Sequence, residues 1–189
     1  MSQNTVRKKP RLNHKFRFQL LHEWLVETFE PCNAADIGGG KGLLSYLLIN
    51  SGWNSTVIDP IHQLLPWKFR DIKNNQRIKL TYEERKIVPR VNAPFEEEMA
   101  KDYDLLIGLH AHGCNMKIIN ACSTYKKDFV LLPCCVIDEP IIKEPGINWL
   151  NSLVDYGIDM GFNVKKTKLN FAGQRTVIYS DKYLKKKNV

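Results

Sequence analysis

Short apolar segments alternate with amphipathic helical segments along most of this 189-residue chain. Residues 104–109 and 129–132 are almost continuously apolar, which is typical of strands buried on both faces of a sheet. Strands that alternate with helices form a mostly parallel sheet with helices on both faces. The last apolar segment, residues 176–179, follows its predecessor without a helix. The sequence therefore predicts an α/β three-layer sandwich around a mostly parallel seven-stranded sheet, with the last strand antiparallel.

Apolar periodicity, together with the prolines and glycines that interrupt it, places the individual elements. We expect strands at residues 34–37, 56–58, 77–81, 104–109, 129–132, 162–169 and 176–179. We expect helices at residues 16–29, 43–50, 95–101, 116–125 and 149–160. The segments between them include a connector at residues 82–93 and a loop over the sheet edge at residues 136–147. The length suits one domain.

The net charge of +8 is concentrated at the two ends of the chain. Residues 1–17 carry six basic side chains and no acidic one, and residues 165–189 carry eight basic side chains and one acidic one. We therefore predict a basic flexible arm at residues 1–13, a domain at residues 14–182 and a basic tail at residues 183–189. The basic ends fit either solvated tails or a contact surface for RNA or DNA.

Composition also indicates the cellular compartment of the protein. Its longest apolar runs are far shorter than the roughly 20 residues that a membrane helix needs, and its start shows no secretory signal. Five cysteines are an odd number, which disfavours a disulfide scaffold. We therefore expect a cytoplasmic protein without membrane contact, and the sequence leaves its oligomeric state open.

A glycine-rich turn follows the first predicted strand. It contains Asp36 and four glycines, Gly38, Gly39, Gly40 and Gly42, and a helical segment comes directly after it. Glycines let a backbone approach a ligand closely, and the first turn of a helix offers free N–H groups. Asp59 ends the next strand, where a carboxylate can accept the hydroxyl groups of a ribose. A nucleotide-like ligand follows, although the dinucleotide fingerprint would need glycine where Leu43 stands.

The spacing D-x-G-x-G-x-G resembles motif I of class I S-adenosylmethionine-dependent methyltransferases, and Asp59 resembles their acidic ribose ligand. The resemblance implies a Rossmann-like fold and S-adenosylmethionine as cofactor. It places Asp36 and residues 38–40 along the methionine part of the cofactor and Asp59 on its ribose. We assign the cofactor to Asp36, Gly38, Gly39, Gly40, Gly42 and Asp59. No residue stands out as the adenine ligand.

Two further motifs follow the fourth and fifth predicted strands. His110-Ala111-His112-Gly113 and Pro133-Cys134-Cys135 resemble the H-x-C-G and Cys-Cys motifs of a methyltransferase branch that includes a tRNA ribose-methylating family. The chain departs from that branch, because His112 stands where cysteine is usual and Asn115-Met116 where an acidic residue is expected. In such sheets the ligand binds at the carboxyl ends of the strands, at the point where strand order reverses. The loops at Gly38 and His110 should therefore face each other, with the Pro133 loop beside them.

These loops supply the candidate chemistry. We predict that His110 and His112 are catalytic, since a histidine can accept a proton at neutral pH. We predict that Arg17, Cys134 and Cys135 contact the acceptor. Other roles stay open, namely a structural histidine, a nucleophilic Cys134, or zinc binding by His110, His112, Cys114, Cys134 and Cys135. Because the spacing shows no paired-ligand framework, we assign no metal.

The sequence thus predicts an S-adenosylmethionine-dependent methyltransferase that acts on RNA. The motif [DNS]-P-P-[YFW] of amino-methyltransferases is absent after the fourth strand, which argues against methylation of exocyclic amines of bases. Two alternatives remain. One is a methyltransferase of a small molecule or a protein, and the other is a catalytically inactive nucleic-acid-binding module of the same fold.

Overall fold

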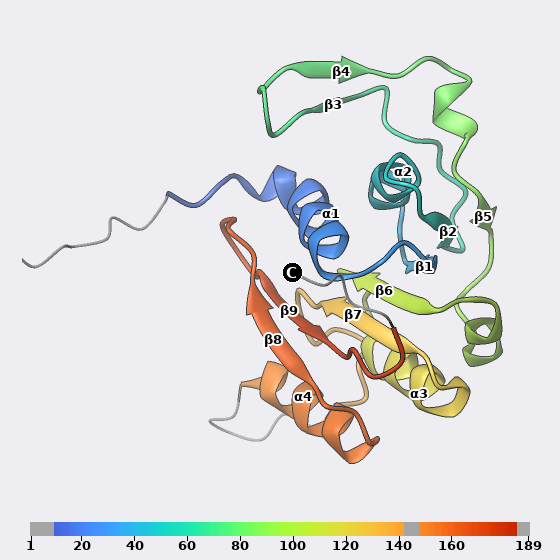
Figure 1. Cartoon of the computed structure of the whole chain (residues 1–189), viewed down its shortest axis with the longest axis vertical. Coiled ribbons are helices and arrows are strands. Elements are labelled where there is room, and N and C mark those ends of the chain that lie inside the picture. Colours follow the sequence, from blue (N-terminus) through green and yellow to red (C-terminus); the bar gives the residue numbers. More distant parts are fainter. Residues whose placement is uncertain (1–9, 142–147, 185–189) are drawn as a thin grey trace, which may run out of the picture.

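A computed structural model describes residues 10–141 and 148–184 (Figure 1). Its main sheet contains β1 (Asn33–Ile37), β2 (Asn54–Ile58), β5 (Arg90–Val91), β6 (Leu105–Leu109), β7 (Asp128–Leu132), β8 (Lys165–Lys168) and β9 (Thr176–Tyr179). A separate hairpin contains β3 (Lys68–Arg70) and β4 (Arg77–Lys79). The α-helices are α1 (Arg17–Thr28), α2 (Leu43–Ile49), α3 (Asn115–Tyr125) and α4 (Trp149–Asp159). Short 3-10 helices are η1 (His14–Phe16), η2 (Glu84–Lys86) and η3 (Glu97–Asp102).

The seven strands lie in the order β5-β2-β1-β6-β7-β9-β8. Strand β1 pairs in parallel with both β2 and β6, so the strand order reverses there. Strand β9 is antiparallel to both of its neighbours, β7 and β8. The prediction of a mostly parallel seven-stranded sheet with an antiparallel last strand is therefore confirmed.

Helices cover both faces of this sheet, α1 and α2 on one side and α3 and α4 on the other (Figure 1). The strands supply both cores because successive side chains point to opposite faces. Ala34 and Leu105 pack toward α1 and α2, whereas Ala35 and Leu106 pack toward α3 and α4. All four side chains are fully buried. This is the predicted three-layer sandwich.

The prediction of the third strand at residues 77–81 is wrong. Arg77–Lys79 pairs instead with Lys68–Arg70 as an antiparallel hairpin, which extends beyond α2 at the top of Figure 1. The third strand of the main sheet is β5, within the predicted connector, and it pairs in parallel with β2. Strand β5 is only two residues long, which is too short to show a periodic pattern. The alternation of Ile78 and Leu80 fits a strand of a hairpin as well as a strand of the main sheet. The predicted helix at residues 95–101 is the 3-10 helix η3.

Both ends of the described chain are tied to the domain. Leu12 pairs with Phe171, and its backbone N–H donates to Asn170 O over 3.1 Å. At the other end, the buried Asp128 carboxylate accepts hydrogen bonds from Ser180 Oγ and from the backbone N–H groups of residues 182–184. Residues 1–9, 142–147 and 185–189 lie outside the described residues, and with them lie most of the predicted arm, most of the tail and part of the loop at 136–147. Within the part described, no helix is both long enough and apolar enough to cross a bilayer.

Candidate functional site

The glycine loop, residues 38–42, joins β1 to α2 at the point where the strand order reverses. It depends on glycine at two positions above all. A Cβ atom on Gly39 would lie 2.6 Å from Cγ of Asp36, which no real side chain could accept. Gly42 has φ of 80°, a left-handed conformation that side chains rarely adopt, and it is the N-cap of α2. The loop is thus shaped closely around Asp36.

Side chains from two other strands hold the loop in place. The Gly40 N–H donates to Asp59 Oδ2 over 2.9 Å, and the Ile61 N–H donates to Asp59 Oδ1 over 2.8 Å. Arg90, the first residue of β5, donates from Nη2 to Gly40 O over 2.5 Å. Sequence reasoning missed Arg90 because it assigned this residue to a connector. The acid that ends β2 and the arginine of β5 therefore act on the same loop residue.

Asp36 is buried beneath the loop with half of its carboxylate satisfied. Ser45 Oγ donates to its Oδ2 over 3.0 Å, whereas Oδ1 has no hydrogen-bond partner among the described residues. Burial raises the pKa of the Asp36 carboxyl to about 7, although the Ser45 hydrogen bonds and the charge of Arg90 oppose the shift. A cation placed against Oδ1 would offset the cost of burying this group.

A first cavity of about 420 Å³ lies over the loop, between residues 38–43 and the start of α1. Three buried polar atoms that line its walls have no hydrogen-bond partner among the described residues: Asp36 Oδ1, Arg17 Nε and His110 Nε2. Buried polar groups are almost always paired, so each of these atoms calls for a partner. The acidic and the basic group suit a ligand that carries both an ammonium and a carboxylate.

A second cavity, of about 540 Å³, adjoins the first. Gly38 and His110 line both cavities, and the second extends to apolar walls at Ile58, Pro60 and Phe95. Phe95 lies between β5 and η3, a segment where the sequence offered no adenine ligand. The two cavities together run from the charged groups of the first to the apolar walls of the second.

His110 stands where the two cavities meet, and its backbone is in the left-handed region with φ of 58°. Such a conformation is costly for a residue other than glycine and is concentrated at functional sites. Its ring stacks on His14 with the ring centres 5.4 Å apart. Burial lowers the pKa of His110 to about 4, and the neighbouring charge of Arg17 acts in the same direction. The imidazole is therefore neutral at physiological pH.

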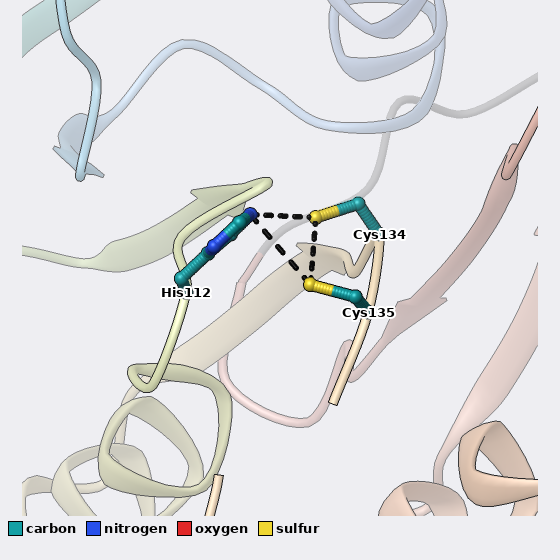
Figure 2. Close-up of side chains that lie close together, drawn as sticks. All are labelled: His112, Cys134 and Cys135. Atoms are coloured by element: carbon teal, nitrogen blue, oxygen red, sulfur yellow. Dashed lines mark hydrogen bonds between the residues drawn. The ribbon is translucent and has the colours of Figure 1, made fainter. Parts of the chain in front are cut away.

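The His112 side chain contacts the loop that follows β7. Figure 2 shows His112, Cys134 and Cys135 pointing toward one another, and we call this group the thiol–imidazole cluster. His112 Nε2 lies 3.0 Å from Cys134 Sγ and 3.7 Å from Cys135 Sγ, and the two sulfurs are 3.5 Å apart. Burial raises the pKa of the Cys134 thiol to about 11, with the Cys135 thiol acting in the same direction. The structure therefore brings together three of the five residues that the sequence offered as possible zinc ligands, without His110 or Cys114.

The hairpin presents a basic face that the sequence did not reveal. Lys68 lies directly opposite Lys79, and Arg70 lies directly opposite Arg77. Like charges in such cross-strand pairs repel each other. Averaging charge over the middle of the chain concealed this face, because residues 66–92 hold eight basic and three acidic side chains within an otherwise acidic region. An anion laid along this face would relieve the repulsion.

Aromatic side chains flank the hairpin. Trp67 is 61% exposed and Tyr82 is 53% exposed. Arg85 Cζ lies 3.8 Å from the ring centre of Trp67, and Lys86 Nζ lies 3.7 Å from that of Tyr82. A third cavity of about 440 Å³ runs from Tyr82 and Lys86 to Lys41 of the glycine loop. A hollow with polar, apolar and aromatic walls thus lies between the glycine loop and residues 82–86, which follow the hairpin.

Comparison with known proteins identifies the fold. No protein-family model and no curated protein matches the sequence. Among solved structures, precorrin-6y C5,15-methyltransferase from Geobacter metallireducens superposes with a TM-score of 0.52 at 15% identity, over 95% of this chain and 90% of that one. A putative tRNA methyltransferase from Streptococcus pneumoniae gives 0.51 at 14% identity, over 89% and 71%. The antibiotic-resistance methyltransferase Kmr gives 0.51 at 14%, over 85% and 92%. The chain therefore has the fold of class I S-adenosylmethionine-dependent methyltransferases.

Proposed function

We propose that this protein transfers a methyl group from S-adenosylmethionine, which binds across the first and second cavities. The observation that supports this most directly is the set of buried atoms around the first cavity that have no partner among the described residues. The methionine end of the cofactor carries an ammonium that suits Asp36 Oδ1 and a carboxylate that suits the Arg17 guanidinium. The sequence assigned Arg17 to the acceptor, and this proposal moves it to the cofactor.

The nucleoside end would extend past Gly38 into the second cavity. Pro60 and Phe95 offer apolar surfaces for an adenine ring there. Asp59 follows β2 between Ile58 and Pro60, which line the second cavity, and binds Gly40 of the first, and its carboxylate keeps spare lone pairs beyond those used by Gly40 and Ile61. This arrangement keeps the predicted roles of Asp36, the glycines and Asp59 in a single site.

S-adenosylmethionine supplies an electrophilic methyl group to a nucleophilic acceptor. We propose that His110 accepts the proton that the acceptor loses, because its Nε2 is buried and unpartnered among the described residues and the residue lines both cavities. A base must lie within hydrogen-bond reach of the proton that it removes. The left-handed backbone conformation of His110 is consistent with such a role, because strained conformations are concentrated at functional sites.

We propose RNA as the acceptor, on the evidence of the hairpin. Its paired cations would contact phosphates, and Trp67 and Tyr82 offer exposed rings on which bases can stack. The third cavity, which begins at Tyr82 shortly after the hairpin, would take a single strand on to Lys41 and the glycine loop. The basic residues 1–9 and 185–189 would add to this attraction. A cytoplasmic location remains part of the proposal, since all five cysteines are free thiols.

Transfer of a labelled methyl group tests the proposal. The full chain is incubated with labelled S-adenosylmethionine and with separate fractions of cellular RNA, protein and metabolites. We expect label in the RNA fraction, removed by ribonuclease and strongly reduced by His110→Ala. Label confined to protein or metabolites would overturn the choice of acceptor. Salt-sensitive RNA binding without any transfer would identify an inactive binding module instead.

A further inference from the structure

The thiol–imidazole cluster stands out from the rest of the described chain. Across residues 10–141 and 148–184, it is the one group of three or more His, Cys, Asp or Glu side chains whose ligand atoms all lie within 4.8 Å of one another. The proposed methyl transfer uses neither thiol. The cluster therefore needs an explanation of its own.

We propose that His112, Cys134 and Cys135 bind one zinc ion through Nε2 and the two Sγ atoms, with the fourth coordination position open. Tetrahedral zinc, with Zn–S bonds of about 2.3 Å and Zn–N bonds of about 2.1 Å, holds its ligand atoms about 3.6–3.8 Å apart. The separations in the cluster are 3.0, 3.5 and 3.7 Å. Shifts of about half an ångström are therefore enough to form the site.

The chemistry of the three ligands favours zinc over harder cations. Magnesium and calcium are held by oxygen atoms, and this cluster offers none from a side chain. Two thiolates neutralise the charge of one zinc ion, and a neutral imidazole adds no charge. A neutral site is well suited to Cys134 and Cys135, which are both half-buried.

The sheet positions the ligands without help from a metal. Leu109, the last residue of β6, lies opposite Leu132, the last residue of β7. His112 is three residues beyond the first of these, and Cys135 is three residues beyond the second. Both strands are fully buried, so the two loops leave a rigid platform side by side. A site supported in this way is preorganised for binding.

The open position distinguishes this site from a purely structural one. Three protein ligands and an exchangeable fourth position are the arrangement of catalytic zinc sites. His112 also lines the second cavity, together with His110 and Lys117. A zinc ion on His112 would therefore stand beside that cavity, where an oxygen or nitrogen donor can complete its coordination.

Cobalt substitution tests the site directly, without any assay of methyl transfer. The full chain is reduced, freed of metal and titrated with Co²⁺ in the absence of oxygen. We expect thiolate-to-cobalt charge-transfer bands and the intense visible bands of tetrahedral cobalt, saturating at one ion per chain and abolished by zinc. Cys134→Ser, Cys135→Ser and His112→Ala should each weaken binding on the order of 100-fold or more, since each removes one of three ligands. Cys32→Ser is the matched control, because this half-buried thiol lies at the opposite end of β1, and it should bind cobalt normally.

Thiol alkylation keeps the test decisive if a variant fails to fold. In the wild-type chain, equimolar zinc should protect Cys134 and Cys135 from alkylation and leave Cys32 unprotected, as measured by mass spectrometry of the peptides. Absent charge-transfer bands, unchanged affinity in Cys134→Ser, or equal alkylation with and without zinc would each overturn the proposal. A disulfide between Cys134 and Cys135 that persists with zinc and reductant present would also overturn it and would indicate a redox pair.

Discussion

The glycine loop and the β3–β4 hairpin differ in what holds them. The loop is bound from outside, by Asp59 at the end of β2 and by Arg90 of β5. The turn of the hairpin is bound mainly from within, by local hydrogen bonds among residues 70–76. The buried carboxylate of Asp36 lies beneath the loop backbone, whereas the hairpin displays its charged groups. A site that must hold reacting atoms needs the first design, and a surface that follows a flexible polyanion suits the second.

The largest expected effect on this comparison is the loss of methyl transfer when His110, beside the glycine loop, is replaced. We expect His110→Ala to lower the rate of methyl transfer about 10²–10⁴-fold, the usual contribution of an acid–base residue. The affinity for S-adenosylhomocysteine should change little, because the proposed contacts to the cofactor come from other side chains. Single-turnover kinetics and calorimetry measure the two quantities separately.

His22→Gln is the matched control for this variant. His22 is a partly buried histidine on α1 that contacts Ser51 Oγ, away from both cavities. It should keep the wild-type rate. A normal rate in His110→Ala would show that His110 is not the general base, and the cavity would then be only a binding site.

The second effect is the dependence of folding stability on pH that comes from Asp36, because burying this carboxylate beneath the glycine loop costs free energy when it is ionised. Its pKa is about 7 in the folded chain against an ordinary value of 3.8, so the folded state holds the extra proton between these values. The stability of the cofactor-free chain should therefore fall as pH rises from about 4 to about 7 and then level off, by about 4 kcal/mol at most. Arg90 and Asp59, the charged groups that face Asp36, act in opposite directions.

Asp36→Asn removes this titration and keeps an oxygen for the Ser45 hydrogen bond. The variant should be more stable than the wild type above pH 7, and the difference should vanish toward pH 4. Urea unfolding across this pH range measures it through the shift in midpoint. Parallel curves for the two proteins would show that Asp36 is ionised and solvated in the folded chain.

The third effect concerns Asp59, which links the loop to the proposed ribose site. We expect Asp59→Ala to weaken cofactor binding about 10- to 100-fold, because charge-assisted hydrogen bonds of about 1.5–3 kcal/mol are lost. Asp71→Ala, in the hairpin, should leave cofactor binding unchanged. Equal losses in both variants would mean that the two regions are not independent.

The smallest effect concerns the hairpin. Lys68→Ala combined with Lys79→Ala removes one cross-strand pair of like charges. We expect the log–log dependence of RNA affinity on salt to flatten by about 1.4, at about 0.7 for each lost phosphate contact with a single strand. The thermal midpoint should stay equal or rise, since a repulsion is removed.

Lys166→Ala with Lys168→Ala removes the same charge from β8, at the far edge of the sheet. This control should keep the wild-type salt dependence. If both double variants flatten the slope equally, RNA is attracted by net charge and not by the hairpin.

The sheet was predictable where strands are long and buried, and not where they are short. The predicted strands at residues 104–109 and 129–132 correspond to β6 (Leu105–Leu109) and β7 (Asp128–Leu132), because burial on both faces demands a continuous apolar run. Strand β5 has two residues and derives its place from pairing with β2, which no local pattern encodes. The alternation at residues 77–81 predicts a strand but carries no information about which strand it pairs with, so it does not distinguish the hairpin from the main sheet.

The site shows the same limit. The spacing of Asp36, the glycines and Asp59 indicated a nucleotide-like ligand, because loop and acid lie at the ends of neighbouring strands. Arg90 and Phe95 carry no such signal, since they reach the site from a segment without periodicity. The sequence placed the histidine and cysteine loops side by side, but it did not show that the side chain of His112, and not that of His110, contacts both thiols.

The central claim is that the cavities over the glycine loop bind S-adenosylmethionine. Calorimetric titration of the full chain with S-adenosylhomocysteine, and separately with NAD, tests this most directly. We predict binding of one S-adenosylhomocysteine per chain, weakened in Asp59→Ala and unchanged in Asp71→Ala, and no binding of NAD. Tight binding of NAD with none of either sulfur cofactor would contradict the assignment of the site.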